Sequence, residues 1–243
     1  MKNLCGYLGL FQPPLNGYMS SIYCVATPDK RNLVMVPLVA NFFETAYSVA
    51  KEPEYQRIFL VLPSLDMLLI SDAYLFYYEI AKKLNKKVEI FCNDKPQIPV
   101  TDEFYSHVHI YSMDKTFQFT DYLNNDENFD IKVEYRTQFR PINRSAADIY
   151  ISTNGKRILF CEYMSKVKLD NLEQTGDIDF IDEIHIPFMK NFYGGMNYIE
   201  TRRNVSPKYL SKFYAFGFAS KEEAELCASG VGKFSEVKYN DFI

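Results

Sequence analysis

The chain has 243 residues, is 47% hydrophobic and 16% aromatic, and carries a net charge of −4, a composition that excludes disorder for most of its length. Its five cysteines lie far apart and form no CxxC pair, which favours a reducing compartment and gives no sign of a zinc site. No apolar run reaches the roughly 18 residues of a membrane span, and Pro13 interrupts the N-terminal apolar stretch, so we expect a cytoplasmic protein with no membrane partner.

The first half of the chain alternates apolar runs with helical patterns. A short helix that begins near Asn41 should end before Pro53. The apolar run RIFLVL at 57–62 predicts a strand covered on both faces. Apolar residues at helical spacing then predict a helix: Leu69, Ala73, Phe76, Tyr77, Ile80 and Leu84. The run VEIFC at 88–92 completes a strand-helix-strand unit with parallel strands.

The second half of the chain is rich in strand patterns. Residues 93–130 contain prolines and many acids, and they are the best candidate for a linker. Residues 131–139 alternate between apolar and polar side chains, as in a half-exposed strand. Two further strands are predicted at 182–188 and 213–218, and Ser220 should begin a last helix.

These elements predict an α/β fold that becomes mixed α+β in the second half. A Rossmann-like strand-helix-strand unit is followed by a mixed sheet that contains a β-hairpin. We assign residues 1–125 to an α/β region with the parallel unit and residues 126–243 to a mixed β-hairpin/α region. The two regions could also form one continuous domain.

The hairpin is predicted from two apolar runs that flank Asn154-Gly155, a strong turn signal. A two-residue turn pairs Ile151 with Ile158 and gathers the apolar residues on one face. In this register Asp148 faces Cys161, so Asp148 and Glu162 point to opposite sides of the sheet. A three-residue turn would place both acids on one face instead.

Basic residues gather in the second half although the chain is acidic overall. Residues 131–168 hold eight basic residues against three acids, whereas residues 169–183 hold six acids and no base. Such segregation suggests a ligand rich in phosphate, although an ordinary solvated strand face is the competing interpretation. The candidate phosphate-binding residues are Arg136, Arg140, Arg144, Lys166, Lys168, Arg202 and Arg203.

Aromatic and glycine residues complete the candidate binding surface. The chain has 19 Tyr and 20 Phe but no Trp, and a few of these rings could stack on a base or a sugar. The candidates for stacking are Tyr163, Tyr193 and Tyr198. Gly194 and Gly195 lie just before Arg202, where their backbone could approach a phosphate. This stretch resembles the phosphate-side loop of phage DNA glycosyltransferases.

Asp148 and Glu162 are the candidate catalytic residues. In the favoured register Glu162 continues an apolar strand face, which should raise its pKa and suit it to glycosyl-bond chemistry. An Asp on one hairpin strand and a Glu on the next also resemble the active site of restriction-like PD-(D/E)xK nucleases, in which two carboxylates hold Mg²⁺. The lysine position of that motif holds Met164, and Lys166 is the nearest substitute.

Other chemistry has little support in the sequence. The chain has three histidines, His107, His109 and His185, and none lies near a nucleophile motif. The pair HVH at 107–109 could place two imidazoles on one strand face, but no third metal ligand is indicated. There is no GxGxxG or P-loop motif.

Three functions follow from these observations. The leading hypothesis is an enzyme that acts on nucleic acid or a nucleotide by glycosyl-bond chemistry, as a glycosylase or a glycosyltransferase, with no metal and no cofactor. The first alternative is a Mg²⁺-dependent restriction-like nuclease that uses Asp148 and Glu162. The second is a non-catalytic module that binds nucleic acid or protein. In each nucleic-acid case we expect DNA rather than RNA as the partner.

Overall fold

In the computed structural model the chain forms two compact units. The first comprises Met1–Lys115 with Glu236–Ile243, and the second comprises Thr116–Ser235. The structure describes residues 6–12, 22–27, 29, 31–38, 42–62, 75–92, 108–110, 116–118, 132–139, 145–153, 155–161, 163–188, 195–217 and 237–239. Most of the expected linker and all of the helix expected to begin at Ser220 lie outside these residues.

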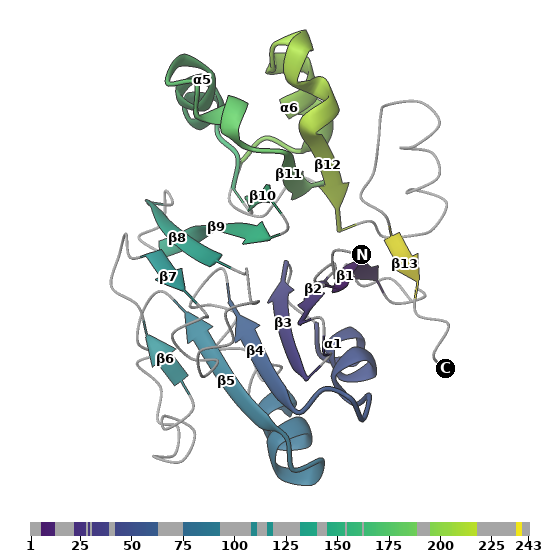
Figure 1. Cartoon of the computed structure of the whole chain (residues 1–243). Coiled ribbons are helices and arrows are strands. Elements are labelled where there is room, and N and C mark those ends of the chain that lie inside the picture. Colours follow the sequence, from purple (N-terminus) through teal and green to yellow (C-terminus); the bar gives the residue numbers. More distant parts are fainter. Residues whose placement is uncertain are drawn as a thin grey trace. The chain divides into compact units, whose positions relative to one another are not determined.

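The first unit is built on a mixed sheet of seven described strands, in the order β13-β1-β2-β3-β4-β5-β6 (Figure 1). Strands β3 to β6 run parallel, whereas β2 is antiparallel to both β1 and β3. The predicted parallel strands at 57–62 and 88–92 are confirmed as β4 and β5. The strands are β1 (Gly6–Gln12), β2 (Ile22–Ala26), β3 (Asn32–Pro37), β4 (Arg57–Val61), β5 (Lys87–Cys92), β6 (Val108–Ile110) and β13 (Val237–Tyr239).

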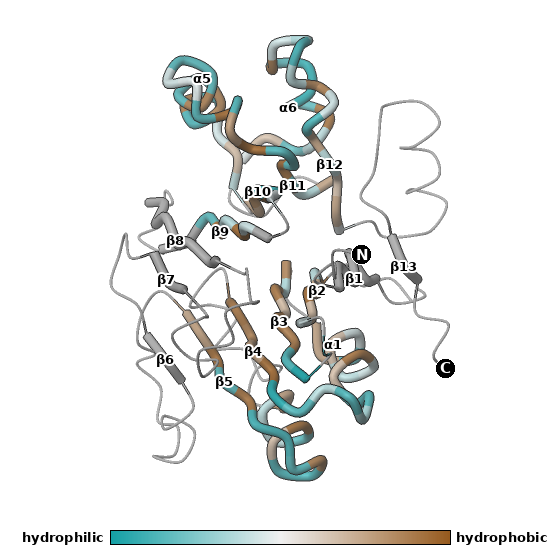
Figure 2. Tube along the Cα trace, viewed as in Figure 1, coloured by the Kyte–Doolittle hydropathy of each residue, from teal (hydrophilic) through white to brown (hydrophobic). Residues whose placement is uncertain are grey.

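Two helices pack their apolar sides against this sheet. They are α1 (Phe43–Ala50) and η1 (Tyr77–Lys83). Alternate residues of β2 to β5 meet them in one apolar cluster that includes Leu60, Ile90 and Phe42. The apolar character of these central strands is visible in Figure 2. Helix α1 ends at Ala50, before Pro53, as predicted.

The helix predicted from the spacing of residues 69–84 has a wider turn than an α-helix in its described part. Its described part, η1, is a π-helix, in which Leu84 N–H donates to Glu79 O, five residues back, at 3.3 Å. Phe76 and Ile80 are buried as predicted, but Leu84 is 36% exposed. The wider turn rotates successive residues by a smaller angle, so Leu84 no longer lies on the face that Ile80 presents to the sheet.

The second unit is built on a mixed sheet of six described strands, in the order β12-β11-β10-β9-β8-β7. Strands β7 to β10 are antiparallel neighbours, and β10, β11 and β12 run parallel. The strands predicted at 131–139, 182–188 and 213–218 are present. The strands are β7 (Thr116–Gln118), β8 (Lys132–Phe139), β9 (Ser145–Thr153), β10 (Lys156–Phe160), β11 (Glu183–Pro187) and β12 (Phe213–Phe216).

The register of the hairpin formed by β9 and β10 is the favoured one. Ile151 pairs with Ile158 and Ile149 with Phe160, and all four side chains are buried. Gly155 in the turn has a φ of +71°, in the left-handed region that favours glycine. The alternating pattern therefore predicted the hairpin correctly, because a shift by one residue would have moved these four side chains to the other face of the sheet.

Helices α5 (Lys166–Gln174) and α6 (Tyr198–Asn204) lie on the same side of this sheet (Figure 1). Two short 3₁₀ helices follow them, η3 (Asp177–Phe180) after α5 and η4 (Pro207–Lys212) after α6. The predicted fold class, α/β with a mixed second half, is thereby confirmed. Among the described residues no helix is both long and apolar enough to cross a membrane.

Candidate functional site

A cavity of about 570 Å³ lies beside helix α5 in the second unit. Its volume falls within the range of small-molecule sites, which runs from about 300 to 1,000 Å³. Strand β9, helix α5 and the segments that flank α5 supply its walls. The lining residues are Asp148, Tyr150, Tyr163, Ser165, Val167, Lys168, Asn171, Leu172, Thr175 and Asp177.

A buried polar cluster forms one wall of the cavity. The Lys168 ammonium donates a hydrogen bond to Asp148 Oδ2 and another to Cys161 Sγ, the latter at 2.9 Å. The side chains of Lys168 and Asp148 are only 15% and 6% exposed. Asp148 and Cys161 face each other across the hairpin, as the register predicted. Burial of opposite charges is tolerated here because each charge has its partner.

The electrostatics of this cluster argue against a nucleophile. Burial raises the pKa of the Cys161 thiol to about 12, which keeps the sulfur protonated near neutral pH. Burial alone would lower the pKa of Lys168, but Asp148 and Cys161 outweigh burial and hold it above its ordinary value. Lys168 is therefore a fixed cation rather than a free amine.

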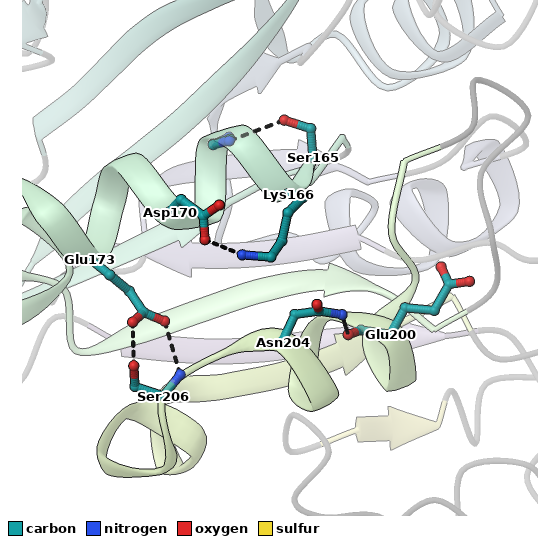
Figure 3. Close-up of polar contacts among 8 residues, drawn as sticks. Ser165, Lys166, Asp170, Glu173, Glu200, Asn204 and Ser206 are labelled. Atoms are coloured by element: carbon teal, nitrogen blue, oxygen red, sulfur yellow. Dashed lines mark hydrogen bonds and ion pairs between the residues drawn. The ribbon is translucent and has the colours of Figure 1, made fainter.

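Helix α5 begins beside this cluster. Ser165 is its N-cap, and Ser165 Oγ accepts a hydrogen bond from the Lys168 backbone N–H at 3.1 Å (Figure 3). This bond fixes the first turn of the helix, so Lys168 projects toward the sheet. Lys166 instead forms an exposed ion pair with Asp170. The cap therefore positions the one lysine of the pair that reaches the cavity.

Tyr163 is held against the cavity by the close approach of Gly195. A Cβ atom at Gly195 would lie 2.9 Å from Tyr163 Cδ2 and 3.3 Å from Met164 O. Glycine is needed because no real Cβ atom tolerates the shorter distance. The backbone of Met196 also donates to Met164 O at 2.7 Å. The glycine predicted to approach a ligand thus approaches an aromatic ring that lines the cavity.

Polar contacts fasten α6 and η4 to α5 and η3. Ser206 N–H donates to Glu173 Oε1 at 2.9 Å, and the Ser206 hydroxyl donates to the other oxygen of the same carboxylate (Figure 3). Asn197 and Glu200 form a capping box that begins α6. The Lys212 ammonium donates to three carbonyl oxygens at the end of η3, those of Ile178, Asp179 and Ile181.

A second titratable cluster lies on the opposite face of the same sheet. The His185 ring is fully buried between Phe160 and Tyr214, with centroids 4.9 and 5.3 Å away. His185 Nε2 lies 3.1 Å from Glu183 Oε2, and Lys156 pairs with the other oxygen at 2.9 Å. Burial would raise the pKa of Glu183, but its bonds to His185 and Lys156 lower it to about 2. Burial lowers the pKa of His185 despite Glu183.

The predicted binding residues have different environments. Lys166 and Lys168 are paired with acids, Arg202 donates to Leu210 O at 3.0 Å, and Arg203 is exposed. Tyr198 is completely buried, and its hydroxyl donates to Phe213 O.

The structure brings only some of the candidates together. Tyr163 and Lys168 share the cavity with Asp148, and Arg136 is the direct neighbour of Asp148 across β8 and β9. The remaining candidates lie outside the described residues: Glu162, Arg140, Arg144, Tyr193 and Gly194.

Sequence reasoning missed Asn171 and Asp177 as lining residues and did not pair Lys168 with Asp148. A signal for the pair was available. Ser165 precedes a helical stretch and marks an N-cap, so Lys168 lies one turn into a helix that directly follows β10. The pairing of Glu183 with His185 was also readable, since residues two apart on a strand share a face.

Solved structures resemble this chain in fold. The metallo-β-lactamase fold protein YhfI from Bacillus subtilis aligns over 98% of this chain and 94% of its own, with a TM-score of 0.57 and 14% identity. CmlA β-hydroxylase aligns over 92% of this chain but only 51% of its own, with a TM-score of 0.54 and 11% identity. No protein-family model and no curated protein sequence matches the chain. The likeness assigns the metallo-β-lactamase fold and leaves the activity open.

This fold corrects two predictions. The leading hypothesis of glycosyl-bond chemistry is wrong, because the chain shares its fold with metallo-β-lactamase fold proteins. The expectation of no metal and no cofactor is also wrong, since the fold is named after metal-dependent enzymes. Apolar periodicity and a lone carboxylate could not reveal either point, because both features occur in unrelated folds.

The described residues do not by themselves supply a metal site. Among them no three His, Cys, Asp or Glu side chains lie close enough together to hold an ion, whereas a catalytic zinc usually takes three protein ligands. His185 is enclosed by two aromatic rings and bonded to Glu183. The structure does not describe His107 or the side chain of His109. No step of the chemistry is therefore assigned to a metal.

Proposed function

We propose that this chain is a nucleic-acid-binding protein of the metallo-β-lactamase fold that seats one base of a strand in the cavity beside α5. The observation that carries the proposal is Tyr163, whose ring lines a cavity of nucleotide size and is fixed by Gly195. Base stacking on an aromatic side chain supplies much of the affinity in proteins that bind single strands. Residues 131–168 hold eight basic residues against three acids, and although Lys156, Lys166 and Lys168 are paired with acids, this excess supports a phosphate-bearing partner.

The arrangement favours binding over nucleophilic catalysis. Cys161 and Lys168 are locked in a buried cluster, and His185 lies on the opposite face of the sheet, away from the cavity. What remains open to a ligand is a set of aromatic, hydroxyl, amide and carboxylate groups. These groups recognise a base by stacking and hydrogen bonding.

Tyr163→Ala should weaken binding of short single-stranded RNA and DNA by about 1–3 kcal/mol, roughly 5-fold to 150-fold, because one base loses its stacking partner. Tyr163→Phe keeps the ring and should bind like the parent protein. Fluorescence anisotropy of labelled strands at fixed salt measures both. Tyr78→Ala is the matched control, since Tyr78 is 48% exposed and lies in the first unit.

Gly195→Ala tests the positioning of the ring. The added methyl group must displace Tyr163, so this variant should bind weakly as well. In the Tyr163→Ala background only the tight contact with Met164 O remains, so the methyl group should cause a smaller further loss. Unchanged affinity in Tyr163→Ala, or equal losses from Gly195→Ala in both backgrounds, would show that the ring is not part of the binding site.

A second candidate function is a Mg²⁺-dependent nuclease at the same hairpin. One observation favours it: a lysine, Lys168, contacts the hairpin carboxylate Asp148, although Met164 occupies the motif position and the observed register is the one expected to separate Asp148 from Glu162. Under this function labelled strands should be cut with MgCl₂ and remain intact with EDTA, and Asp148→Asn should abolish cutting. Binding without any cutting in either buffer would leave the binding function alone.

A further inference from the structure

We infer that the cavity selects the base it holds and prefers one with an exocyclic amino group over one with a carbonyl at the same position. This inference rests on the proposed function and names the ligand class of the same cavity. The deciding residue is Asp177, at the first position of η3 on the rim.

The charges of the cavity single out Asp177. The lining contains two acids, Asp148 and Asp177, and one cation, Lys168. Lys168 neutralises Asp148 by direct contact and gives a further hydrogen bond to Cys161. Within the described part of the chain the Asp177 carboxylate makes no hydrogen bond or ion pair, although its backbone N–H donates to Thr175 Oγ1 at 3.3 Å. The uncompensated charge in the cavity is therefore negative.

The neighbouring polar groups are partly occupied. Thr175 Oγ1 donates to Asn171 O at 2.9 Å and also accepts from Asp177 N–H. Ser165 Oγ accepts from the Lys168 backbone. Asn171 is exposed, and its side-chain amide can donate and accept, so it does not discriminate between bases. The selective group in the lining is Asp177, which only accepts.

A carboxylate that only accepts hydrogen bonds distinguishes cytosine from uracil. The N4 amino group of cytosine donates, and Asp or Glu is its natural partner. The corresponding O4 of uracil is an acceptor, which the carboxylate repels. Phosphate is disfavoured in the cavity for the same reason, so the phosphates of the strand lie outside it.

The test compares labelled oligo-C and oligo-U of equal length, because both are pyrimidines and offer rings of the same size for stacking. The parent protein should bind oligo-C about tenfold more tightly, the scale of one specific base contact. Asp177→Asn should make the two affinities equal, since an amide can donate to O4 as well as accept from N4.

Asp179→Asn is the matched control, because Asp179 is also exposed and lies in η3 but does not line the cavity. It removes the same charge and should keep the preference for oligo-C. Equal binding of both strands by the parent protein, or an unchanged preference in Asp177→Asn, would overturn the inference. Loss of all strand binding, or binding indifferent to Tyr163→Ala, would instead overturn the proposed function.

Discussion

Asp148→Ala should lower the free energy of unfolding by about 3–5 kcal/mol, the cost of removing one partner from a buried ion pair. The substitution leaves the Lys168 ammonium enclosed beside Cys161 without its carboxylate. Water reaches little of it, because the side chain of Lys168 is only 15% exposed. Urea unfolding followed by circular dichroism measures the loss at neutral pH.

Two further variants distinguish the loss of the ion pair from a general loss of packing. Asp148→Ala combined with Lys168→Met removes both charges and should recover a large part of the lost stability. Asp170→Ala breaks the exposed pair with Lys166, whose side chains are 52% and 41% exposed, and should cost at most about 1 kcal/mol. Similar losses from the two single variants would mean that the cluster around Lys168 is not a buried ion pair in solution.

The stability of the protein should fall on acidification in two steps that arise from β11. The pKa of His185 is lowered in the folded state, so the neutral ring favours folding above the ordinary histidine pKa of about 6.5 and this contribution is lost below it. The pKa of Glu183 falls from 4.5 to about 2 on folding, so its contribution is present above 4.5 and is lost as the pH falls toward 2.

A double variant isolates this pH dependence. His185→Phe with Glu183→Gln keeps an aromatic ring between Phe160 and Tyr214 but removes both titrating groups. The loss of stability between pH 7 and pH 3 should then be smaller by at least about 2 kcal/mol, the part of the Glu183 contribution that falls in this interval, because the His185 contribution is removed as well. Urea unfolding at the two pH values measures the difference. An identical loss in parent and double variant would contradict the assignment to these residues.

The apolar patterns were sufficient to predict much of the local structure. Strands β4 and β5 and the hairpin register could be predicted because burial of their apolar side chains stabilises the folded state. Such patterns could not predict the order of the strands across each sheet. Strand β1 pairs with β13 from the opposite end of the chain, and no local periodicity encodes that pairing, so the metallo-β-lactamase fold was not recognised.

The candidate site was predicted only in part for a related reason. The pairing of Ile149 with Phe160 placed Asp148 opposite Cys161, because these two residues are the next pair along the hairpin. The path of the chain after β10 determines which lysine contacts Asp148 and Cys161. The sequence pattern alone does not distinguish between the several lysines that follow. The N-cap at Ser165 selects Lys168. Asp177 joins the cavity only through the turn after α5, which begins at the left-handed Gly176 with a φ of +75°.

The contacts of Lys212 with the end of η3 bear on how this part of the molecule opens. They and the bond between Ser206 and Glu173 join segments more than thirty positions apart in sequence. Backbone amides of α5 and α6 should therefore exchange their hydrogens through one shared opening event rather than by independent fraying. A ligand in the cavity would then slow exchange in α6 and η4 although none of their residues lines the cavity.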